Sequence, residues 1–553
     1  MDGAAGISRR DAELIGMLNT TMGTRGMVTA PHHMAAEAGR DVLRENGTAT
    51  EAMIAAAAVI AVVYPHMNAI GGDGFWLVSS PGEKPVGIDA CGPAARLATR
   101  AWYRERGWSA IPARGPAGAL TVPGTIGGWR AALSQAAVRG GNLPLSRLLE
   151  PAMALARDGV PVTAGQAALT QAKLSELRDL PGFSETFLDA AGCPLDCGAR
   201  LHQPTLADTL EHLGRVGLHD FYRGDIARSM AGDLEAMGSP LRLDDFMRYE
   251  ALTVEPLSLR VGKACLYNMP PPTQGLASLL ILGIHDRVPV PNDRVPVPNT
   301  DEFRLIHGLV ESTKQAFLIR DTHVTDPHWM TVNPDDLLTD ERLNAAAGKI
   351  DPTQAAPWPD PGPAGDTVWM GAMDSEGQSV SFIQSVYWEY GTGVVLPDSG
   401  VLMQNRGMSF GLDAAHSQAL EPGRRPFHTL NPAMASFDDG RHMVYGTMGG
   451  EGQPQTQAAI FTRYAHQGLP LQKAVTAPRW LLGRTWGDST SSLKLESRFP
   501  ARLVEQLEEA GHNIELAADF DSMMGHAGAI VRHPDGLLEG ATDPRSDGAV
   551  SAS

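Results

Sequence analysis

The chain has 553 residues, of which 43% are apolar and 20% charged, and its formal net charge is −18. This composition is typical of a soluble globular protein, and the negative charge argues against binding to nucleic acid. The longest apolar stretch, 52–64, is shorter than the roughly 20 residues that span a bilayer. The N-terminal arginines are not followed by an apolar run, so we expect a cytoplasmic protein without membrane contact.

The pattern of residues 25–80 predicts alternating helices and strands. Thr48 is a suitable N-cap for a buried helix over 52–64. Glycines surround Asp73 in the segment 71–74, but no Lys-Ser/Thr pair follows, so a tight backbone approach before a buried strand is favoured over a phosphate loop. Further along, 145–235 is mostly helical in pattern, and the apolar spacing of 301–323 predicts another helix.

Two segments are typical of loops. Residues 286–292 and 293–299 are a tandem repeat of one Pro-rich heptad, and two copies are too few for a solenoid. The Pro/Gly-rich stretch 351–364 predicts an exposed, mobile segment, suited to being cut and moved aside.

The cysteines and histidines give no strong metal signal. Cys193 and Cys197 could form a redox pair or half a zinc site, but no second pair accompanies them, so ordinary thiols in a loop are favoured. Two histidine pairs lack a suitably spaced third ligand: His32 with His33, and His323 with His328. We therefore expect no metal and no cofactor.

Residues 366–385 carry the most informative pattern. A strand is predicted over 367–374, a polar turn over 375–378 and a second strand over 379–385. Thr367 stands where the first strand opens, directly after Asp366. Taken alone, this pattern is a β-hairpin with a threonine at its mouth.

Several other short motifs follow one another in a fixed order along the chain. They are TVPGTIGGW (121–129), QPTLADTL (203–210), FYRG (221–224), MPPPT (269–273), GTGVV (391–395), TDPR (542–545) and DG (547–548). Together with the hairpin after Thr367, in this order and spacing, they make the chain resemble the γ-glutamyltranspeptidases from about residue 25 to 549.

The resemblance implies an α+β fold, the αββα sandwich of the N-terminal-nucleophile hydrolases. It also implies a precursor that cleaves itself between Asp366 and Thr367. The products would be a large subunit, 1–366, with a flexible linker at about 351–366, and a small catalytic subunit, 367–553. A threonine hydroxyl is a weak nucleophile that needs a base, and cleavage frees the α-amine of Thr367 for that role.

Supporting roles can be assigned from the same resemblance. Ser385 matches the family threonine whose hydroxyl hydrogen-bonds the nucleophile, and serine keeps that oxygen. Gly449 and Gly450 match the glycine pair whose N–H groups form the oxyanion hole. Without the resemblance, Gly449-Gly450 would be interpreted as a plain turn.

The chain departs from the family where the substrate is recognised. The family arginine segment corresponds to 88–94, which has no arginine. The aspartate that receives the substrate ammonium aligns with Ser409, and the paired serines become His428-Thr429. Tyr387 replaces an asparagine. The predicted pocket thus loses an anion and gains bulk at Tyr387 and His428.

Arg406 stands where the family usually has a neutral side chain. A small pocket with a planar cation suits a short substrate that has a carboxylate and no amino group. A surface salt bridge for Arg406, and a packed core position for His428, are the alternatives from the residues alone. The pattern is similar to the oxamate amidohydrolase branch of the family, which implies hydrolysis of oxamate to oxalate and ammonia.

Three other functions remain open. One is a γ-glutamyl hydrolase or transferase, another is an acylase of glutaryl-type amides such as the cephalosporin acylases, and the third is an uncut structural or binding protein on the same scaffold. The expected partners are a small-molecule amide and the two subunits of one precursor. The sequence leaves open a higher oligomer, and whether acyl transfer competes with hydrolysis.

Overall fold

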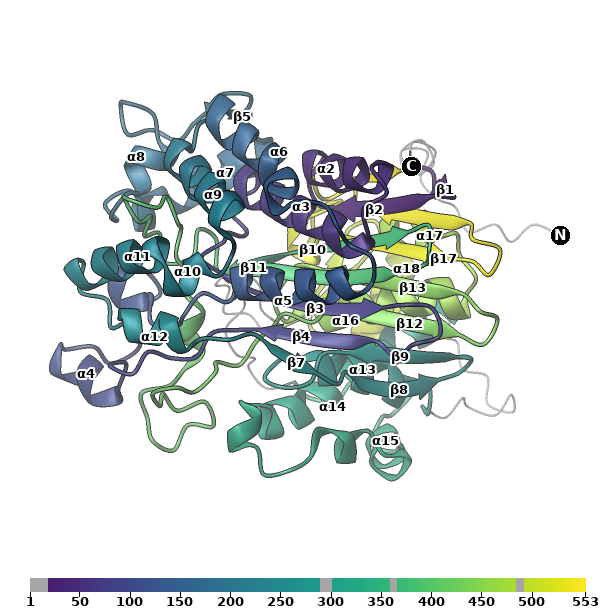
Figure 1. Ribbon diagram of the computed structural model, residues 1–553. Coiled ribbons are helices and arrows are strands. Elements are labelled where there is room, and N and C mark those ends of the chain that lie inside the picture. Colours follow the sequence, from purple (N-terminus) through teal and green to yellow (C-terminus); the bar gives the residue numbers. More distant parts are fainter. Residues whose placement is uncertain (1–17, 289–300, 359–365, 484–491) are drawn as a thin grey trace, which may run out of the picture.

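The computed structural model describes residues 18–288, 301–358, 366–483 and 492–553. Two seven-stranded sheets pack face to face, and helices cover the outer face of each (Figure 1). This arrangement confirms the predicted αββα sandwich. The tandem heptad beyond residue 288 and the segment 359–364 lie outside the described residues.

The first sheet contains the predicted hairpin. Its strands, in spatial order, are β19 (Ala549–Ala552), β2 (Gly26–Ala30), β10 (Asp366–Asp374), β11 (Ser379–Tyr387), β3 (Asp73–Ser79), β4 (Val86–Ala90) and β7 (Leu252–Val254). All pairings within it are antiparallel, and Ser385 in β11 lies opposite Asp73 in β3. The structure therefore confirms the hairpin and places it at the centre of the sheet.

The second sheet is built mostly from the C-terminal part of the chain. Its strands, in spatial order, are β1 (Thr21–Gly23), β18 (Leu538–Thr542), β17 (Ala527–Arg532), β13 (His442–Thr447), β12 (Ala433–Phe437), β9 (Ala264–Asn268) and β8 (Leu257–Val261). Smaller sheets are formed by β5 (Val160–Pro161) with β6 (Arg200–Leu201), and by β14 (Trp480–Leu482), β15 (Leu493–Glu496) and β16 (Ile514–Ala517).

Helices of the N-terminal half cover the hairpin sheet. They are α2 (His33–Arg44), α3 (Ala49–Val63), α5 (Thr125–Val138) and α6 (Leu145–Asp158). Every residue of α3 is buried, and Thr48 and Glu51 form a capping box at its start, which confirms the predicted buried helix.

The second sheet is covered mainly by α13 (Gly275–His285), α14 (Asp301–His323), α16 (Gly452–Phe461) and α17 (Leu471–Thr476). The bounds of α14 confirm the predicted helix over 301–323. The remaining α-helices are α4 (Arg100–Glu105), α7 (Ala164–Leu177), α8 (Phe183–Phe187), α9 (Pro204–Val216), α10 (Asp220–Arg223), α11 (Asp225–Ala236), α12 (Leu243–Arg248), α15 (Asp340–Ala347) and α18 (Ala501–Glu509).

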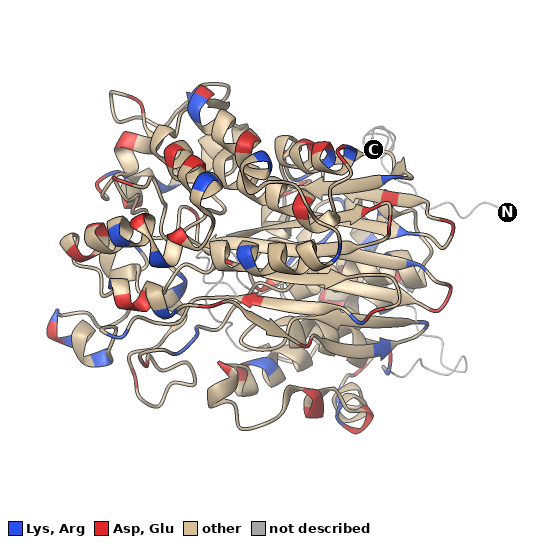
Figure 2. Cartoon of the chain, viewed as in Figure 1, with Lys and Arg blue, Asp and Glu red and all other residues tan. Residues whose placement is uncertain are grey.

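A buried apolar layer joins the two sheets. Trp369 and Ile383 from the hairpin pack in one cluster with Met434, Val444 and Ile530 from the opposite sheet. Because both faces of the hairpin sheet are covered, β11 is buried at every position and has no polar outer face. Most charged residues lie on the outer helices and loops (Figure 2), so a charged residue buried between the layers is unusual in this fold.

The glycines before β3 allow close contact between segments. A Cβ on Gly72 would lie 2.1 Å from the carbonyl oxygen of Ser385, and one on Gly71 would lie 2.2 Å from that of Leu402. The predicted tight backbone approach is therefore confirmed. Within the described residues, no helix combines the length and apolarity needed to cross a bilayer.

Candidate active site

Thr367 lies at the opening of β10 and is 1% exposed. The pairing of β10 with β11 shifts register between Asp366 and Val368, so Thr367 sits at an irregularity in the ladder. Its hydroxyl donates to Ser385 Oγ over 3.4 Å and accepts from Gln453 Nε2 over 3.4 Å. Two polar side chains from separate elements therefore fix the position of the hydroxyl.

The glycine pair lies beside this threonine. Gly449 and Gly450 form the turn between β13 and α16, with φ angles of +117° and +52°, both positive. Gln453, which contacts Thr367, follows three residues later in α16. Among the described residues, no acceptor is paired with the amide of Gly449 or Gly450. The glycine turn is therefore linked to Thr367 through Gln453, and its two N–H groups are not used by a described acceptor.

Arg406 opens a 3-10 turn, Arg406–Ser409, and is 2% exposed. Its Nε donates to the carbonyl of Phe427 over 2.8 Å, Nη2 donates to the same carbonyl, and Nη1 donates to Thr429 Oγ1 over 3.3 Å. The guanidinium carbon lies 3.8 Å from the ring centroid of Tyr387. Arg406 is therefore an interior side chain, and the surface salt bridge considered for it is wrong.

The guanidinium of Arg406 has spare hydrogen-bonding capacity. Three of its five N–H groups are engaged, which leaves one on each terminal nitrogen. No carboxylate oxygen among the described residues lies within ion-pair distance of it. Burial lowers the pKa of Arg406 from its ordinary value. A buried cation that keeps one N–H group on each terminal nitrogen, with no carboxylate at ion-pair distance among the described residues, is suited to a carboxylate ligand.

Asp73 is the residue that sequence reasoning missed. Its Oδ1 accepts from the amides of Gly92 (3.2 Å) and Gly124 (3.0 Å) and from Gln404 Nε2 (3.0 Å). Its Oδ2 lies 2.9 Å from His428 Nε2. The carboxyl is fully buried, and this burial raises its pKa to about 7 although the hydrogen bonds and Arg406 favour ionisation.

His428 lies near two charged side chains, Asp73 and Arg406. It stands between Phe427 and Thr429, both of which accept hydrogen bonds from Arg406. Burial, and then the charge of Arg406, lower its pKa well below the usual range. Its Nδ1 is buried and has no hydrogen-bond partner among the described residues. Nε2 of His428 is thus hydrogen-bonded as in a packed core histidine, whereas Nδ1 has no partner among the described residues.

Two more predicted substrate contacts have distinct environments. Tyr387 is buried and has φ +83°, a conformation that is uncommon outside glycine, and its ring packs on Arg406. Strained residues of this kind cluster at functional sites. The hydroxyl of Ser409 donates to the carbonyl of Arg406 over 3.1 Å, so its observed role is to close the 3-10 turn.

Two groups of side chains have the composition of metal ligands. They are Asp73 with Cys91 and His428, and His307 with Glu311 and His512. In the first group both oxygens of Asp73 already have hydrogen-bond partners, and burial raises the pKa of the Cys91 thiol well above its usual range. In the second, Lys314 Nζ lies 2.6 Å from Glu311 and supplies the positive charge. These contacts account for both groups as hydrogen-bonded clusters.

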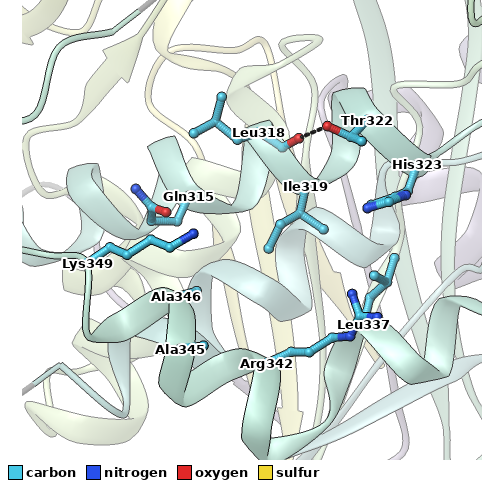
Figure 3. A pocket seen from close by; sticks show the side chains of 10 residues that line it. All are labelled: Gln315, Leu318, Ile319, Thr322, His323, Leu337, Arg342, Ala345, Ala346 and Lys349. Carbon is cyan, nitrogen blue, oxygen red and sulfur yellow. Dashed lines mark hydrogen bonds between the residues drawn. The ribbon is translucent and has the colours of Figure 1, made fainter.

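A surface groove between α14 and α15 lies away from this cluster (Figure 3). It has a volume of about 280 Å³ and is lined by apolar side chains such as Ile319 and Leu337 and by the basic side chains of Arg342 and Lys349. A second cavity, of about 370 Å³, is lined by His285 and other residues near the ends of α13 and α16. None of the residues around Thr367 or Arg406 lines either cavity.

The sandwich, with a buried threonine at the mouth of a central hairpin, defines an N-terminal-nucleophile hydrolase fold. Residues 35–553 match the family model of gamma-glutamyltranspeptidase, so the chain belongs to this family. The oxamate amidohydrolase proenzyme of Klebsiella pneumoniae is 53% identical over 536 residues, which are 97% of this chain and 100% of that protein.

Other relatives span the same length. The glutathione hydrolase-like YwrD proenzyme of Bacillus subtilis is 38% identical over 97% of this chain and 99% of its own. The crystal structure of cephalosporin acylase from Bacillus halodurans superposes with a TM-score of 0.86 at 32% identity, and covers 97% of both chains. The names of these three relatives correspond to the predicted oxamate amidohydrolase and to two of its alternatives, a γ-glutamyl hydrolase and a cephalosporin acylase.

Proposed function

We propose that this protein is a self-processing amidohydrolase that converts oxamate to oxalate and ammonia. The observation that carries the proposal is the buried guanidinium of Arg406, which among the described residues has two N–H groups without an acceptor and no carboxylate at ion-pair distance. Leaving a buried charge unpaired costs several kcal/mol, on the order of 3–5. The 53% identity to the Klebsiella pneumoniae protein over nearly the whole chain supports the same substrate.

Activation proceeds by cleavage of the peptide bond between Asp366 and Thr367. The large subunit is then 1–366, with 351–366 as its C-terminal linker, and the small subunit is 367–553. The hydroxyl of Thr367 donates to Ser385 and accepts from Gln453, and these contacts support the assignment because they hold the hydroxyl at the scissile position before cleavage. The word proenzyme in the names of both relatives agrees with it.

Cleavage supplies the base that the nucleophile needs. The new α-amine of Thr367 has an ordinary pKa of roughly 7.7–8.0 and accepts the hydroxyl proton directly or through water. The hydroxyl oxygen attacks the amide carbon, and the amides of Gly449 and Gly450 donate to the oxyanion. The protonated α-amine gives its proton to the leaving nitrogen, and ammonia departs. Water then hydrolyses the acyl-enzyme, which releases oxalate and restores Thr367.

The charged side of the site binds the other end of the substrate. Arg406 donates its two free N–H groups to the carboxylate, while the ring of Tyr387 and the hydroxyl of Thr429 keep the guanidinium in one orientation. His428 offers Nδ1 to the same substrate, and Ser409 acts through the turn that carries Arg406. Tyr387 closes one face of the guanidinium, which favours a short acyl group over γ-glutamyl or glutaryl chains.

The test is ammonia release by the purified, self-cleaved protein from oxamate, with γ-glutamyl and glutaryl amides alongside. We expect turnover of oxamate to be about 100-fold faster than of either longer amide, because Tyr387 covers one face of the guanidinium and favours a short acyl group. Complete cleavage at 366–367 without ammonia release from oxamate would support Thr367 as the nucleophile but overturn oxamate as the substrate. A chain that stays uncut would support the scaffold alternative.

A further inference from the structure

Three charged or titratable side chains face one another at the anion-binding end of the site. Asp73 contacts His428 at 2.9 Å, Arg406 brackets His428 through its contacts with Phe427 and Thr429, and all three are at most 2% exposed. They come from β3, from the 3-10 turn and from the segment before β12, which the fold brings together. A substrate carboxylate would add a second negative charge beside a single cation.

The proton count of the Asp73–His428 pair determines whether this added charge is balanced. With one proton between Oδ2 and Nε2 the pair carries a net charge of −1. A second proton makes the pair neutral, either as imidazolium with carboxylate or as a carboxylic acid with Nδ1–H. In both neutral forms His428 Nδ1 carries a proton, and Nδ1 is the buried nitrogen that has no partner among the described residues.

We propose that the Asp73–His428 pair takes up one proton when Arg406 binds a carboxylate, so that the site accepts one anion together with one proton. This inference rests on the proposed function and deepens it. The balance is simple: the free site, with a pair of charge −1 and one guanidinium, is neutral, and the complex with one anion and one added proton is neutral again. Nδ1–H then becomes a donor for the substrate.

The neighbouring titratable groups do not take over this role. The charged or titratable groups around the pair are Arg406, Arg425, Asp89, Cys91, Tyr222 and Tyr249. Burial raises the pKa values of Cys91, Tyr222 and Tyr249 well above their usual ranges, so these groups stay neutral. Arg425 is already paired with Asp89 at 2.5 Å. The pKa of Asp73, raised to about 7, places its proton exchange near neutrality.

The first test compares an anionic with a neutral substrate on the same nucleophile. Above pH 7 the KM for oxamate should rise by up to tenfold per pH unit, because binding needs a proton that becomes scarcer. The KM for oxamide, a neutral diamide, should not show this rise. Because oxamide uses the same nucleophile, its pH profile also accounts for titration of the Thr367 amine. Oxamate turnover with the same pH profile of KM as oxamide would overturn the inference and leave the proposed function intact.

The second test counts protons. Pyruvate has a methyl group in place of the NH2 group of oxamate and stays a monoanion across this range. Calorimetric titration of the cleaved protein with pyruvate at pH 8, in buffers of different ionisation enthalpy, should show uptake approaching one proton per bound anion. Binding without uptake would overturn the inference. Absence of pyruvate binding at every pH, together with no oxamate turnover, would instead overturn the proposed function.

Two variants locate the proton. Asp73→Asn keeps the shape of the side chain but removes its charge, and His428→Gln keeps a donor near Oδ2 but removes Nδ1. Each should abolish proton uptake and flatten the KM profile of oxamate, whereas His442→Gln, at a buried histidine of β13, should retain both. Uptake that persists in either pair variant would contradict the assignment. Self-cleavage on a denaturing gel shows that a variant has folded. If Asp73→Asn does not fold, His428→Gln alone tests the assignment.

Discussion

The two ends of the site are built from different kinds of groups. Around Thr367 the hydrogen-bond partners are uncharged, a serine hydroxyl and a glutamine amide, and the Gly449-Gly450 turn precedes the helix that carries this glutamine. Around Arg406 they are charged or titratable, fully buried, and held by backbone carbonyls and amides. We propose that the uncharged end acts on the amide carbonyl, whereas the charged end selects the acyl group.

This division explains how one fold carries several substrates. The relatives include proteins named oxamate amidohydrolase, glutathione hydrolase-like protein and cephalosporin acylase, all aligned over nearly the full chain. A hydroxyl, a base and an oxyanion hole are common requirements of amide hydrolysis. Differences in specificity therefore belong at the charged end, where this chain departs from the family pattern.

The largest effect is expected at the uncharged end. Thr367→Ala removes the nucleophile for both reactions, so the chain should stay uncut on a denaturing gel and release no ammonia from oxamate. Thr367→Ser is the matched control, since it keeps the hydroxyl and should still mature. A cut and active Thr367→Ala protein would refute the mechanism.

The next effect separates the two ends. Arg406→Met keeps length and packing on Tyr387 but removes the charge, and kcat/KM for oxamate should fall about 100-fold or more. Self-cleavage should be normal, and turnover of neutral oxamide should change far less. Arg342→Met, at the exposed groove between α14 and α15, is the matched control and should behave as wild type. An equal loss for oxamide and oxamate would show that Arg406 supports the fold and does not bind the carboxylate.

The uncharged end could be predicted because its signals are local or carried by motifs. The hairpin 367–385, the helix capped by Thr48 and the helix 301–323 each follow from contiguous patterns. Ser385 lies only 18 residues from Thr367 in the chain, and the structure shows their contact. The roles of Ser385, Gly449 and Gly450 stay predictions that the variants test.

The charged end could be predicted only in part. Arg406 and His428 stood out because their residue types depart from the family pattern. Asp73 did not, since its partners lie 19, 51, 331 and 355 residues away along the chain. Such a hub leaves no periodicity in the sequence. The one available signal was a carboxylate among glycines before an apolar strand, where burial demands several donors.

A smaller effect is expected at Ser385. Ser385→Ala removes one hydrogen bond to the nucleophile, and kcat for oxamate should fall about 10- to 100-fold with little change in KM. Ser385→Thr restores the family residue and should recover most of the rate. Ser379→Ala, in the same strand but with no hydrogen-bond partner for its hydroxyl among the described residues, should have no effect on kcat. A raised KM with unchanged kcat in Ser385→Ala would place this residue at the substrate and not at the nucleophile.

The smallest expected effect is on thermal stability, and it measures how the burial of Asp73 changes stability with pH. In the unfolded chain its carboxyl ionises near pH 4, whereas in the folded protein the pKa is about 7. Between these values the folded state binds more protons, so the contribution of this group to stability is present at low pH and is lost as pH rises through 7. The Tm of wild type minus that of Asp73→Asn should therefore decrease from pH 5 to pH 8. The same difference for Asp336→Asn, at an exposed carboxyl, should be flat. A difference that instead grows with pH would mean that Asp73 is ionised throughout, stabilised by its four hydrogen bonds and by Arg406.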